Sequence, residues 1–314
     1  MKNDKIMSRA MLETELQNIC KNGIPTGMLC GLNNIDNLCR LDMGMLVTIT
    51  GIPNMGKSEF IDFLVVQYNK LHHLKTLFYS PENQPIGLHL SKLYRKFEGC
   101  DINPNDINGN RFGEIMDYIY NNFYFFNYRF EYTVDTLLAT AETMITEVGI
   151  NILVIDSYNK LNIDIGNNET EAASRFLDKL QRYAIANRIM ILLVAHPRKM
   201  EREPNGAYKI PKGYDINGSA NFLNKSDVVL SVHRNYVPNY TIIHVDKVRF
   251  NNYGGIGDTY LGYNIKSGNF YDIDEQAVAR GCRTIPSPPQ HQQFVIPTNA
   301  IQDNKTAKQH LYNE

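Results

Sequence analysis

The chain has 314 residues, 43% of them hydrophobic and 21% charged, which suits one large α/β domain with extensions or two modest domains. Its formal net charge of -1 gives no overall basic footprint, so any nucleic acid must be held by local basic patches. The five cysteines form no CxxC pair or Cys/His cluster, and no stretch approaches the roughly 20 apolar residues of a membrane helix, so we expect a cytoplasmic protein without a zinc site.

Apolar residues between positions 6 and 20 recur at mostly helical spacing, and Gly23 and Pro25 then end the pattern. Residues 1–24 are therefore predicted to form a short amphipathic helix ahead of the main domain. The pattern leaves two roles open for this helix, which either covers the core of its own domain or docks on a neighbouring subunit.

The next part of the chain, residues 25–275, alternates apolar runs with helical segments. Strands are predicted at 46–50, 76–79, 123–126, 152–156, 189–195, 228–232 and 241–245, and helices at 60–71, 86–97, 134–148 and 169–187. This order predicts an α/β fold with a mostly parallel twisted sheet and helices on both faces. Residues 276–314 are rich in Pro, Gln and Asn with few apolar anchors, so we expect a flexible tail there.

Residues 51–58 read GIPNMGKS, a complete match to the G-x-x-x-x-G-K-[ST] phosphate loop, directly after a predicted strand and before a predicted helix. Backbone N–H groups of such a loop wrap the phosphates, while Lys57 reaches the β and γ phosphates and the Ser58 hydroxyl ligates Mg²⁺. The nucleotide-contacting residues expected here are Gly51, Ile52, Pro53, Asn54, Met55, Gly56, Lys57, Ser58 and Glu59.

Two acidic residues complete the predicted hydrolytic centre. Asp156 ends the strand at 152–156, where a carboxylate of a P-loop enzyme holds the magnesium shell. Glu82 lies just beyond the strand at 76–79 and is the candidate general base that orients or deprotonates water. The ends of these strands would bring both carboxylates to the γ-phosphate.

In this order the motifs resemble those of the DnaB-like hexameric replicative helicases, in particular the helicase half of phage primase–helicases and of Twinkle-like proteins. The resemblance covers roughly residues 8–275 and includes the GLNNID run at 31–36 before the phosphate loop. It implies a RecA-like P-loop NTPase core with a short N-terminal linker helix that swaps between subunits. It also implies a homo-oligomer, expected to be a hexameric ring, that is fuelled by ATP or dTTP with Mg²⁺ in a bacterial or phage-infected cell.

The same resemblance implies roles for residues in the second half of the chain. In the run VAHPRK, His196 corresponds to the sensor of the γ-phosphate. Arg234 and Tyr263 fall where the family packs side chains against the nucleotide base. The runs GSA at 218–220 and KSDVVL at 225–230 also follow the family pattern. Lys247 and Arg249, in the K-x-R-F segment, correspond to cations supplied in trans to the neighbour's γ-phosphate, with Arg249 as the arginine finger.

Contacts to single-stranded DNA are expected from the segment 199–217, which is basic and least like a helix or strand. Lys199, Arg202, Lys209 and Lys212 lie in it, and the equivalent loop of the family lines the ring channel and grips the DNA backbone. Lys160, in the loop after the predicted magnesium aspartate, is a second candidate.

Departures from the family pattern leave other functions open. No primase module precedes the helicase part, so priming, loading or polymerase partners are expected to be separate proteins.

The first alternative to a helicase is a RecA- or KaiC-like ATPase that binds DNA or switches assembly without unwinding. A second alternative is a catalytically weak structural subunit, against which the presence of Glu82 and Arg249 argues.

Overall fold

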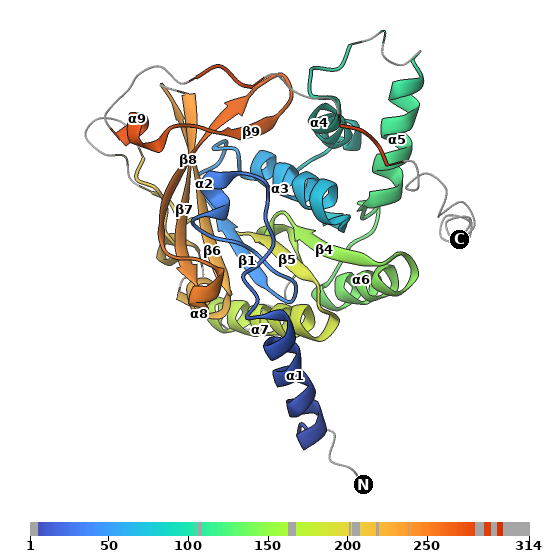
Figure 1. The fold of residues 1–314 in the computed structure, drawn as a ribbon, viewed down its shortest axis with the longest axis vertical. Coiled ribbons are helices and arrows are strands. Elements are labelled where there is room, and N and C mark those ends of the chain that lie inside the picture. Colours follow the sequence, from blue (N-terminus) through green and yellow to red (C-terminus); the bar gives the residue numbers. More distant parts are fainter. Residues whose placement is uncertain are drawn as a thin grey trace.

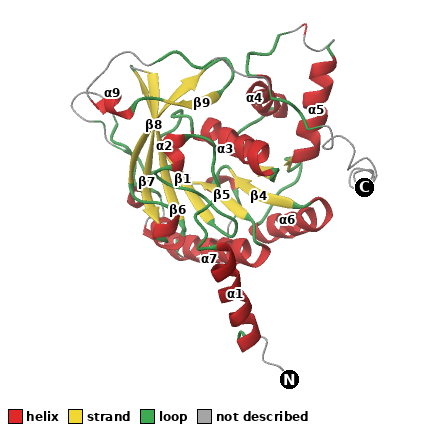
Figure 2. Cartoon of the chain, viewed as in Figure 1, coloured by secondary structure: helices red, strands yellow, loops and turns green. Residues whose placement is uncertain are grey.

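The computed structural model describes residues 6–103, 105, 109–162, 168–200, 202, 208–217, 220–237, 239–279, 286–289 and 294–297. Their centre is a nine-stranded sheet in the order β3-β2-β4-β5-β1-β6-β7-β8-β9 (Figures 1 and 2). The strands are β1 (Leu46–Thr50), β2 (Lys75–Tyr79), β3 (Phe123–Phe125), β4 (Ile150–Ile155), β5 (Met190–Val194), β6 (Val228–Tyr236), β7 (Asn239–Val248), β8 (Gly257–Asn264) and β9 (Asn269–Asp272). The helices are α1 (Arg9–Asn22), α2 (Asn33–Asp36), α3 (Lys57–His72), α4 (Ile86–Glu98), α5 (Asn110–Asn122), α6 (Val134–Val148), α7 (Glu169–Asn187), α8 (Ala220–Lys225) and α9 (Glu275–Ala279).

Two hydrophobic cores lie on opposite faces of the sheet. Val47 and Ile49 of β1 belong to the core that includes residues of α3, α4 and α5, whereas Leu46 belongs to the core that includes residues of α6 and α7. Side chains alternate between the faces of a strand, so a strand buried on both faces is apolar along nearly its whole length. The predicted α/β fold with helices on both faces of the sheet is confirmed.

The C-terminal half of the sheet differs from the prediction. From β6 onward the pairing is antiparallel, β6 and β7 are longer than predicted, and the sequence prediction did not include β8 and β9. The helices α5 and α8 were missed as well. Residues 233–236 at the end of β6 are polar, the first three partly buried and Tyr236 exposed. The apolar run that identified the strand therefore ends at Val232, before the strand does.

The helix α1 stands apart from the body of the domain (Figure 1). The Ser8 hydroxyl caps it by accepting a hydrogen bond from the Met11 N–H, and none of its residues is buried. Its apolar side chains are exposed, as Leu12 at 54% and Leu16 at 63% illustrate. This arrangement does not bear out the possibility that the helix covers the core of its own subunit.

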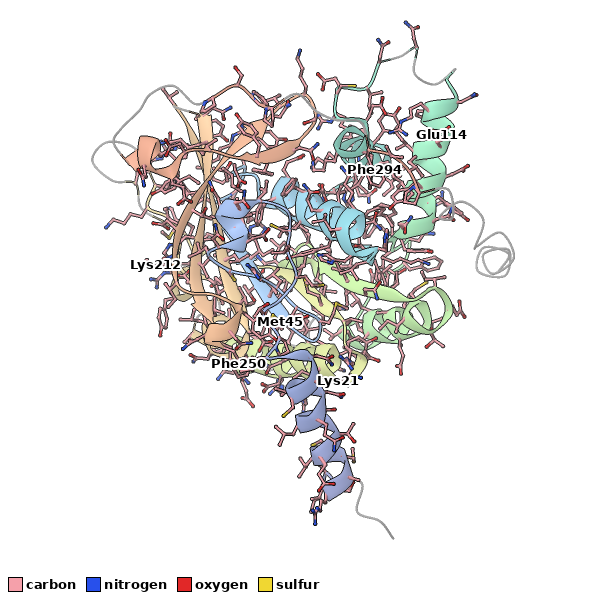
Figure 3. The ribbon with its side chains drawn as sticks, in the orientation of Figure 1. Lys21, Met45, Glu114, Lys212, Phe250 and Phe294 are labelled. Carbon is pink, nitrogen blue, oxygen red and sulfur yellow. The ribbon has the colours of Figure 1, made fainter. Side chains whose placement is uncertain are left out.

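Part of the predicted flexible tail packs against the domain. The Phe294 ring lies 5.4 Å from each of the rings of Phe97 and Tyr118, on α4 and α5, and Arg111 Nη2 donates to its carbonyl oxygen at 2.6 Å (Figure 3). The helix α9 also continues across the predicted boundary at residue 275. The prediction of a flexible tail rested on the average composition of residues 276–314, which is polar. A single aromatic residue such as Phe294 does not change that average, although it packs on the domain. The tail beyond residue 297 lies outside the described residues.

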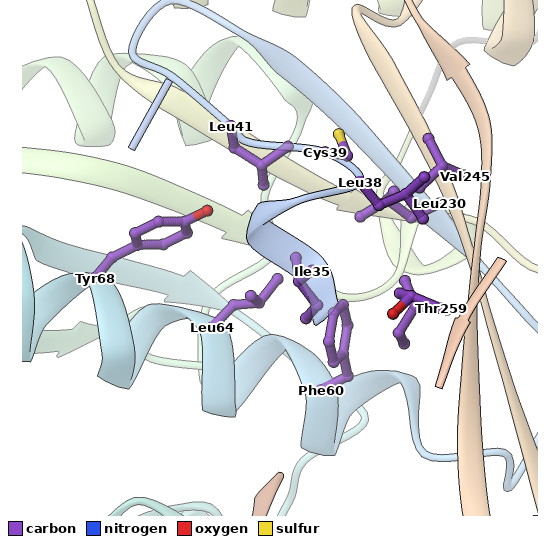
Figure 4. A pocket seen from close by; sticks show the side chains of 11 residues that line it. Ile35, Leu38, Cys39, Leu41, Phe60, Leu64, Tyr68, Leu230, Val245 and Thr259 are labelled. Carbon is purple, nitrogen blue, oxygen red and sulfur yellow. The ribbon is translucent and has the colours of Figure 1, made fainter. Parts of the chain in front are cut away.

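A cavity beside α3 is a packing gap rather than a ligand site. It is lined by side chains that include Leu41, Leu64, Tyr68 and Val245 (Figure 4), and its volume is about 10 Å³. That space holds no more than about one water molecule. Within the described ranges, no helix combines the length and apolarity needed to cross a bilayer.

Candidate functional site

The phosphate loop, residues 51–56, joins the end of β1 to the start of α3. Gly51 lies so close to β6 that a Cβ atom added to it would come within 2.4 Å of the Val232 carbonyl oxygen. Gly56 has a φ of 88°, in the left-handed region that glycine adopts without steric cost. One glycine is therefore required by a close approach and the other by the turn into the helix.

Backbone N–H groups at the start of α3 are placed to bind an anion. The first hydrogen bond of the helical pattern runs from the Phe60 N–H to the Gly56 carbonyl oxygen at 2.9 Å, so the N–H groups of residues 57–59 precede it. Such groups point out of the helix N-terminus, where the helix dipole also favours negative charge. The loop and the helix start together suit the phosphates of a nucleotide.

Lys57 lies over this loop and is only 6% exposed. Its Nζ donates to the carbonyl oxygens of Gly51 at 2.8 Å and Ile52 at 3.1 Å. Burial lowers the pKa of Lys57, and the charges of Asp156 and Glu82 oppose that shift. The hydrogen bonds of the ammonium group go to neutral carbonyls, so a phosphate in the loop would supply its missing counter-charge.

Asp156 follows β4 and is 3% exposed. Its Oδ2 accepts a hydrogen bond from the Ser58 hydroxyl at 2.7 Å. Burial raises the pKa of Asp156, which the Ser58 hydrogen bond and the Lys57 charge only partly oppose. Mg²⁺ takes oxygen ligands and favours the charged form of a carboxylate, so the hydroxyl of Ser58 and the buried carboxylate of Asp156 fit a magnesium ion.

Glu82, Ser157 and His196 meet beside the phosphate loop because they follow the neighbouring strands β2, β4 and β5. Glu82 Oε1 accepts from the Ser157 hydroxyl at 2.9 Å and lies 3.6 Å from His196 Nε2. The other ring nitrogen of His196, Nδ1, is buried and has no hydrogen-bond partner within the described part of the chain. The Glu82 side chain is 37% exposed, so water can reach the carboxylate.

The sequence prediction missed several polar residues at this site, among them Asn83 and Lys92. Asn83 Nδ2 donates to Ser80 Oγ at 2.6 Å and lies 3.4 Å from Asp156 Oδ2. Lys92 Nζ of α4 donates to Asn83 Oδ1 at 3.1 Å, which ties the loop to that helix. The available signal was the position of Asn83 beside Glu82, directly after a predicted strand.

The side chain of Glu59 is engaged by α4 and β8. Its carboxylate lies 2.7 Å from Lys96 Nζ and 3.3 Å from Lys92 Nζ, and it accepts from the Tyr263 hydroxyl at 3.2 Å. The Arg234 guanidinium carbon lies 4.7 Å from the centroid of the Tyr263 ring. The structure thus brings Arg234 and Tyr263 together. The Glu59 carboxylate contacts Tyr263, and the Glu59 N–H is one of those that precede the first hydrogen bond of α3.

Lys247 and Arg249 lie at the end of the sheet where β1 begins. The phosphate loop of the same subunit lies at the opposite end, where β1 finishes. The Arg249 N–H donates to the Asp227 carbonyl, and the Asp227 N–H donates to the Leu46 carbonyl at the start of β1, each at 2.8 Å. Arg249 Nη1 lies 2.9 Å from Asp227 Oδ1, and Lys247 Nζ donates to the Leu223 carbonyl at 2.7 Å. The five residues of β1 separate these groups from the loop by about 16 Å.

A cavity of about 200 Å³ opens beside Arg249. Its lining includes Met43, Met45, Ile185 and Phe250, and Figure 3 shows Met45 and Phe250 on the same side of the molecule. Burial lowers the pKa of Lys247, the Arg249 charge lowers it further, and Asp227 opposes both effects. This end of the sheet therefore combines the cations Lys247 and Arg249 with a cavity that is lined largely by apolar side chains.

The two ends of the predicted DNA loop are fastened beside His196. The Asn217 N–H donates to the His196 carbonyl at 3.2 Å, and the Arg198 N–H donates to the Asp215 carbonyl at 2.7 Å. The five predicted DNA-contacting cations are all exposed: Lys160, Lys199, Arg202, Lys209 and Lys212. Residues 201 and 203–207 of this loop and residues 218–219 of the GSA run lie outside the described residues.

The sequence of the chain is similar to that of a known protein. The chain is 34% identical to the Twinkle homolog protein, chloroplastic/mitochondrial, of Arabidopsis thaliana over 262 residues. The match covers 78% of this chain and 36% of that protein, so the chain spans about a third of the length of this relative.

Two solved structures share the fold. One, described as an ATPase domain, superposes with a TM-score of 0.69 at 18% identity, covering 87% of this chain and all of that one. The other is a DnaB-like replicative helicase, described together with its interactions with primase, and gives a TM-score of 0.66 at 19% identity, covering 86% of this chain and 68% of that one. The sheet and helices are therefore those of a RecA-like ATPase domain. The profile of the DnaB-like helicase C-terminal domain matches residues 24–272, and the chain belongs to that family.

Proposed function

We propose that this chain is the motor of a replicative DNA helicase that hydrolyses ATP or dTTP and moves along single-stranded DNA as a hexameric ring. Membership of the DnaB-like family supports this function over a RecA- or KaiC-like switch without unwinding. We further propose that it works in the cytoplasm of a bacterial or phage-infected cell, with a separate primase, loader or polymerase.

In this proposal the residues around the phosphate loop bind and hydrolyse the nucleotide within one subunit. Lys57 exchanges its carbonyl partners for phosphate oxygens, and the N–H groups of residues 57–59 hold the same anion. Ser58 and Asp156 would hold Mg²⁺, which neutralises phosphate charge when bound. Glu82 orients the attacking water and accepts its proton, because its carboxylate is exposed and held by Ser157.

His196 couples this chemistry to DNA. Its ring faces Glu82, while its carbonyl accepts the hydrogen bond that fastens one end of the basic loop. A change in the position of His196 after γ-phosphate loss would therefore move the base of the loop. Exposed cations on the loop give salt-dependent binding to a nucleic-acid backbone without sequence preference.

The position of Arg249 is the single observation that carries the ring proposal. An arginine about 16 Å from the phosphate loop of its own subunit cannot stabilise charge on that subunit's γ-phosphate. It can do so for a neighbour in a head-to-tail assembly, in which one surface meets a different surface of the next subunit and the repeat closes into a ring. The exposed apolar face of α1 is a further surface for such a neighbour.

A subunit-mixing assay tests the ring and the trans arginine together. Lys57→Ala removes the phosphate contact and Arg249→Ala removes the finger, so each variant alone should lose nearly all DNA-stimulated hydrolysis. Mixed rings contain some interfaces with an intact Lys57 from one variant and an intact Arg249 from the other. We expect hydrolysis to recover partly on mixing, to at most about a quarter of the wild-type rate for random assembly.

The matched control is Arg182→Ala, which removes an exposed arginine on α7 and should leave hydrolysis unchanged. No recovery on mixing, with both variants folded and oligomeric, would contradict the trans arrangement. Strand displacement on a forked DNA tests unwinding itself. If wild type hydrolyses ATP but DNA neither stimulates hydrolysis nor is unwound, the helicase function is refuted and the switch function is favoured.

A further inference from the structure

The end of β6 brings a tyrosine to the phosphate loop. In the parallel pairing of β1 with β6, the last residue of β1, Thr50, lies opposite Ser231. The strand β6 continues to Tyr236 and so runs alongside the loop that begins at Gly51. The sequence did not predict a role for Tyr236, because this residue follows the apolar part of the strand and belongs to no motif.

The hydroxyl of Tyr236 holds the tip of the phosphate loop. It donates a hydrogen bond to the Asn54 carbonyl oxygen at 2.9 Å, across 182 positions of sequence. Asn54 has a φ of 65°, in the left-handed region that residues other than glycine adopt uncommonly. A hydrogen bond at this residue therefore favours the loop shape in which the backbone N–H groups are arranged around a phosphate.

The ring of Tyr236 forms the outer layer of a stack. The Arg234 guanidinium carbon lies 5.3 Å from the centroid of the Tyr236 ring and 4.7 Å from that of Tyr263. Tyr263 is 9% exposed, whereas Tyr236 is 57% exposed and so presents its ring to solvent. Arg234 Nε is buried and lacks a hydrogen-bond partner within the described ranges, so it could still donate to an acceptor atom of a ligand.

A nucleobase fits this place by its chemistry. A base is a flat aromatic group with hydrogen-bond acceptors, and it stacks well on aromatic rings and on guanidinium planes. The stack adjoins the loop that holds the phosphates, so a single nucleotide can occupy both places. Neither inorganic phosphate nor an aliphatic ligand would use the exposed ring of Tyr236.

We propose that Tyr236 is a further nucleotide-binding residue: its ring forms the outer wall of the nucleobase site, and its hydroxyl holds the phosphate loop in its binding shape. This inference rests on the proposed nucleotide-hydrolysing function and adds a residue to its site. It predicts two separable contributions, one that depends on the base and one that does not.

Calorimetric titration with Mg²⁺ and either ATP or inorganic tripolyphosphate separates the two contributions. Tyr236→Phe removes only the hydroxyl and should weaken both ligands by about 5-fold, the effect of one hydrogen bond. Tyr236→Leu also removes the ring and should weaken ATP by about 10-fold more, with no further loss for tripolyphosphate. Tyr120→Leu, at an exposed tyrosine on α5, is the control and should change neither affinity.

A fluorescence experiment provides an independent measurement. The chain contains no tryptophan, so Tyr236→Trp introduces a single reporter at the proposed wall. We expect ATP to quench its emission and tripolyphosphate to leave it nearly unchanged. Equal quenching by both ligands, or ATP affinity in Tyr236→Leu within 2-fold of wild type, overturns the role of Tyr236 while leaving nucleotide binding intact. A wild-type chain that binds neither ligand overturns the proposed function as well.

Discussion

Glu59 forms ion pairs with Lys92 and Lys96 and accepts a hydrogen bond from the Tyr263 hydroxyl, and these contacts predict a stability change of defined size. The Lys96 side chain is 0% exposed and that of Glu59 is 19% exposed, at a separation of 2.7 Å. Burial alone would raise the pKa of Glu59, but the charges and hydrogen bonds of Lys96 and Lys92 outweigh burial and lower the pKa from 4.5 to about 2. A shift of this size corresponds to about 3 kcal/mol, at about 1.36 kcal/mol per pKa unit.

The pH dependence follows from the direction of that shift. A carboxyl group with a lowered pKa in the folded state stabilises the fold above its unfolded pKa and loses this contribution as the pH falls through the folded pKa. We therefore expect Glu59→Gln to lower the free energy of unfolding by about 3 kcal/mol at pH 7. At pH 3 the difference between the variant and wild type should shrink to about half, since that pH lies between 4.5 and about 2.

Urea unfolding at the two pH values measures both effects. The double variant Glu59→Gln with Lys96→Met is the matched control, because replacing both members of a buried pair costs much less than removing one. It should recover most of the lost stability at pH 7. A loss below about 1 kcal/mol in Glu59→Gln, or a loss that does not change with pH, would refute the reasoning that this pair stabilises the fold.

Three further predictions concern packing, metal binding and DNA. Phe294→Ala should lower the free energy of unfolding, measured by urea titration, by about 1–2 kcal/mol, which is less than for a fully buried phenylalanine. The control Val295→Ala, at a side chain that is 83% exposed, should change it by less than about 0.5 kcal/mol. Asp156→Asn should reduce Mg²⁺-dependent hydrolysis at least about 100-fold in a phosphate-release assay, because the buried site loses its anionic ligand. The double variant Lys209→Ala with Lys212→Ala should bind single-stranded DNA more weakly in a fluorescence anisotropy assay. The slope of log affinity against log salt concentration should fall in magnitude by about 1.4, because each phosphate that is no longer neutralised contributes about 0.7. An unchanged salt slope would remove these two lysines from the DNA surface.

The sequence predicted the parts of the site that depend on local pattern and on parallel strand ends. Lys57 and Ser58 lie in one contiguous motif, and their geometry follows from the strand and helix on either side of it. Glu82, Asp156 and His196 follow three different strands, yet their meeting was foreseeable because parallel strands end at one edge of a sheet.

Contacts between distant segments could not be predicted in this way. The partner of Glu59, Lys96, lies on another helix, and nothing in either local pattern indicates that they meet. The hydrogen bond between Tyr236 and Asn54 depends on how far β6 runs past its apolar residues. Phe294 is an aromatic anchor within a polar segment, where composition predicts no packing at all.

The sheet also explains why hydrolysis and movement would be linked between subunits. Parallel strands carry Lys57, Glu82, Asp156 and His196 to one edge, and the reversal of direction at β7 carries Arg249 to the other. Under the proposed function, a subunit would bind nucleotide at one end of its sheet and offer Arg249 to its neighbour from the other end. In the proposed head-to-tail ring each Arg249 would contact the γ-phosphate of the next subunit, so loss of that phosphate would change the interface as well as the site. Because the basic loop is fastened at His196, beside the phosphate loop, the same event would move the proposed DNA-binding surface of the subunit that hydrolysed.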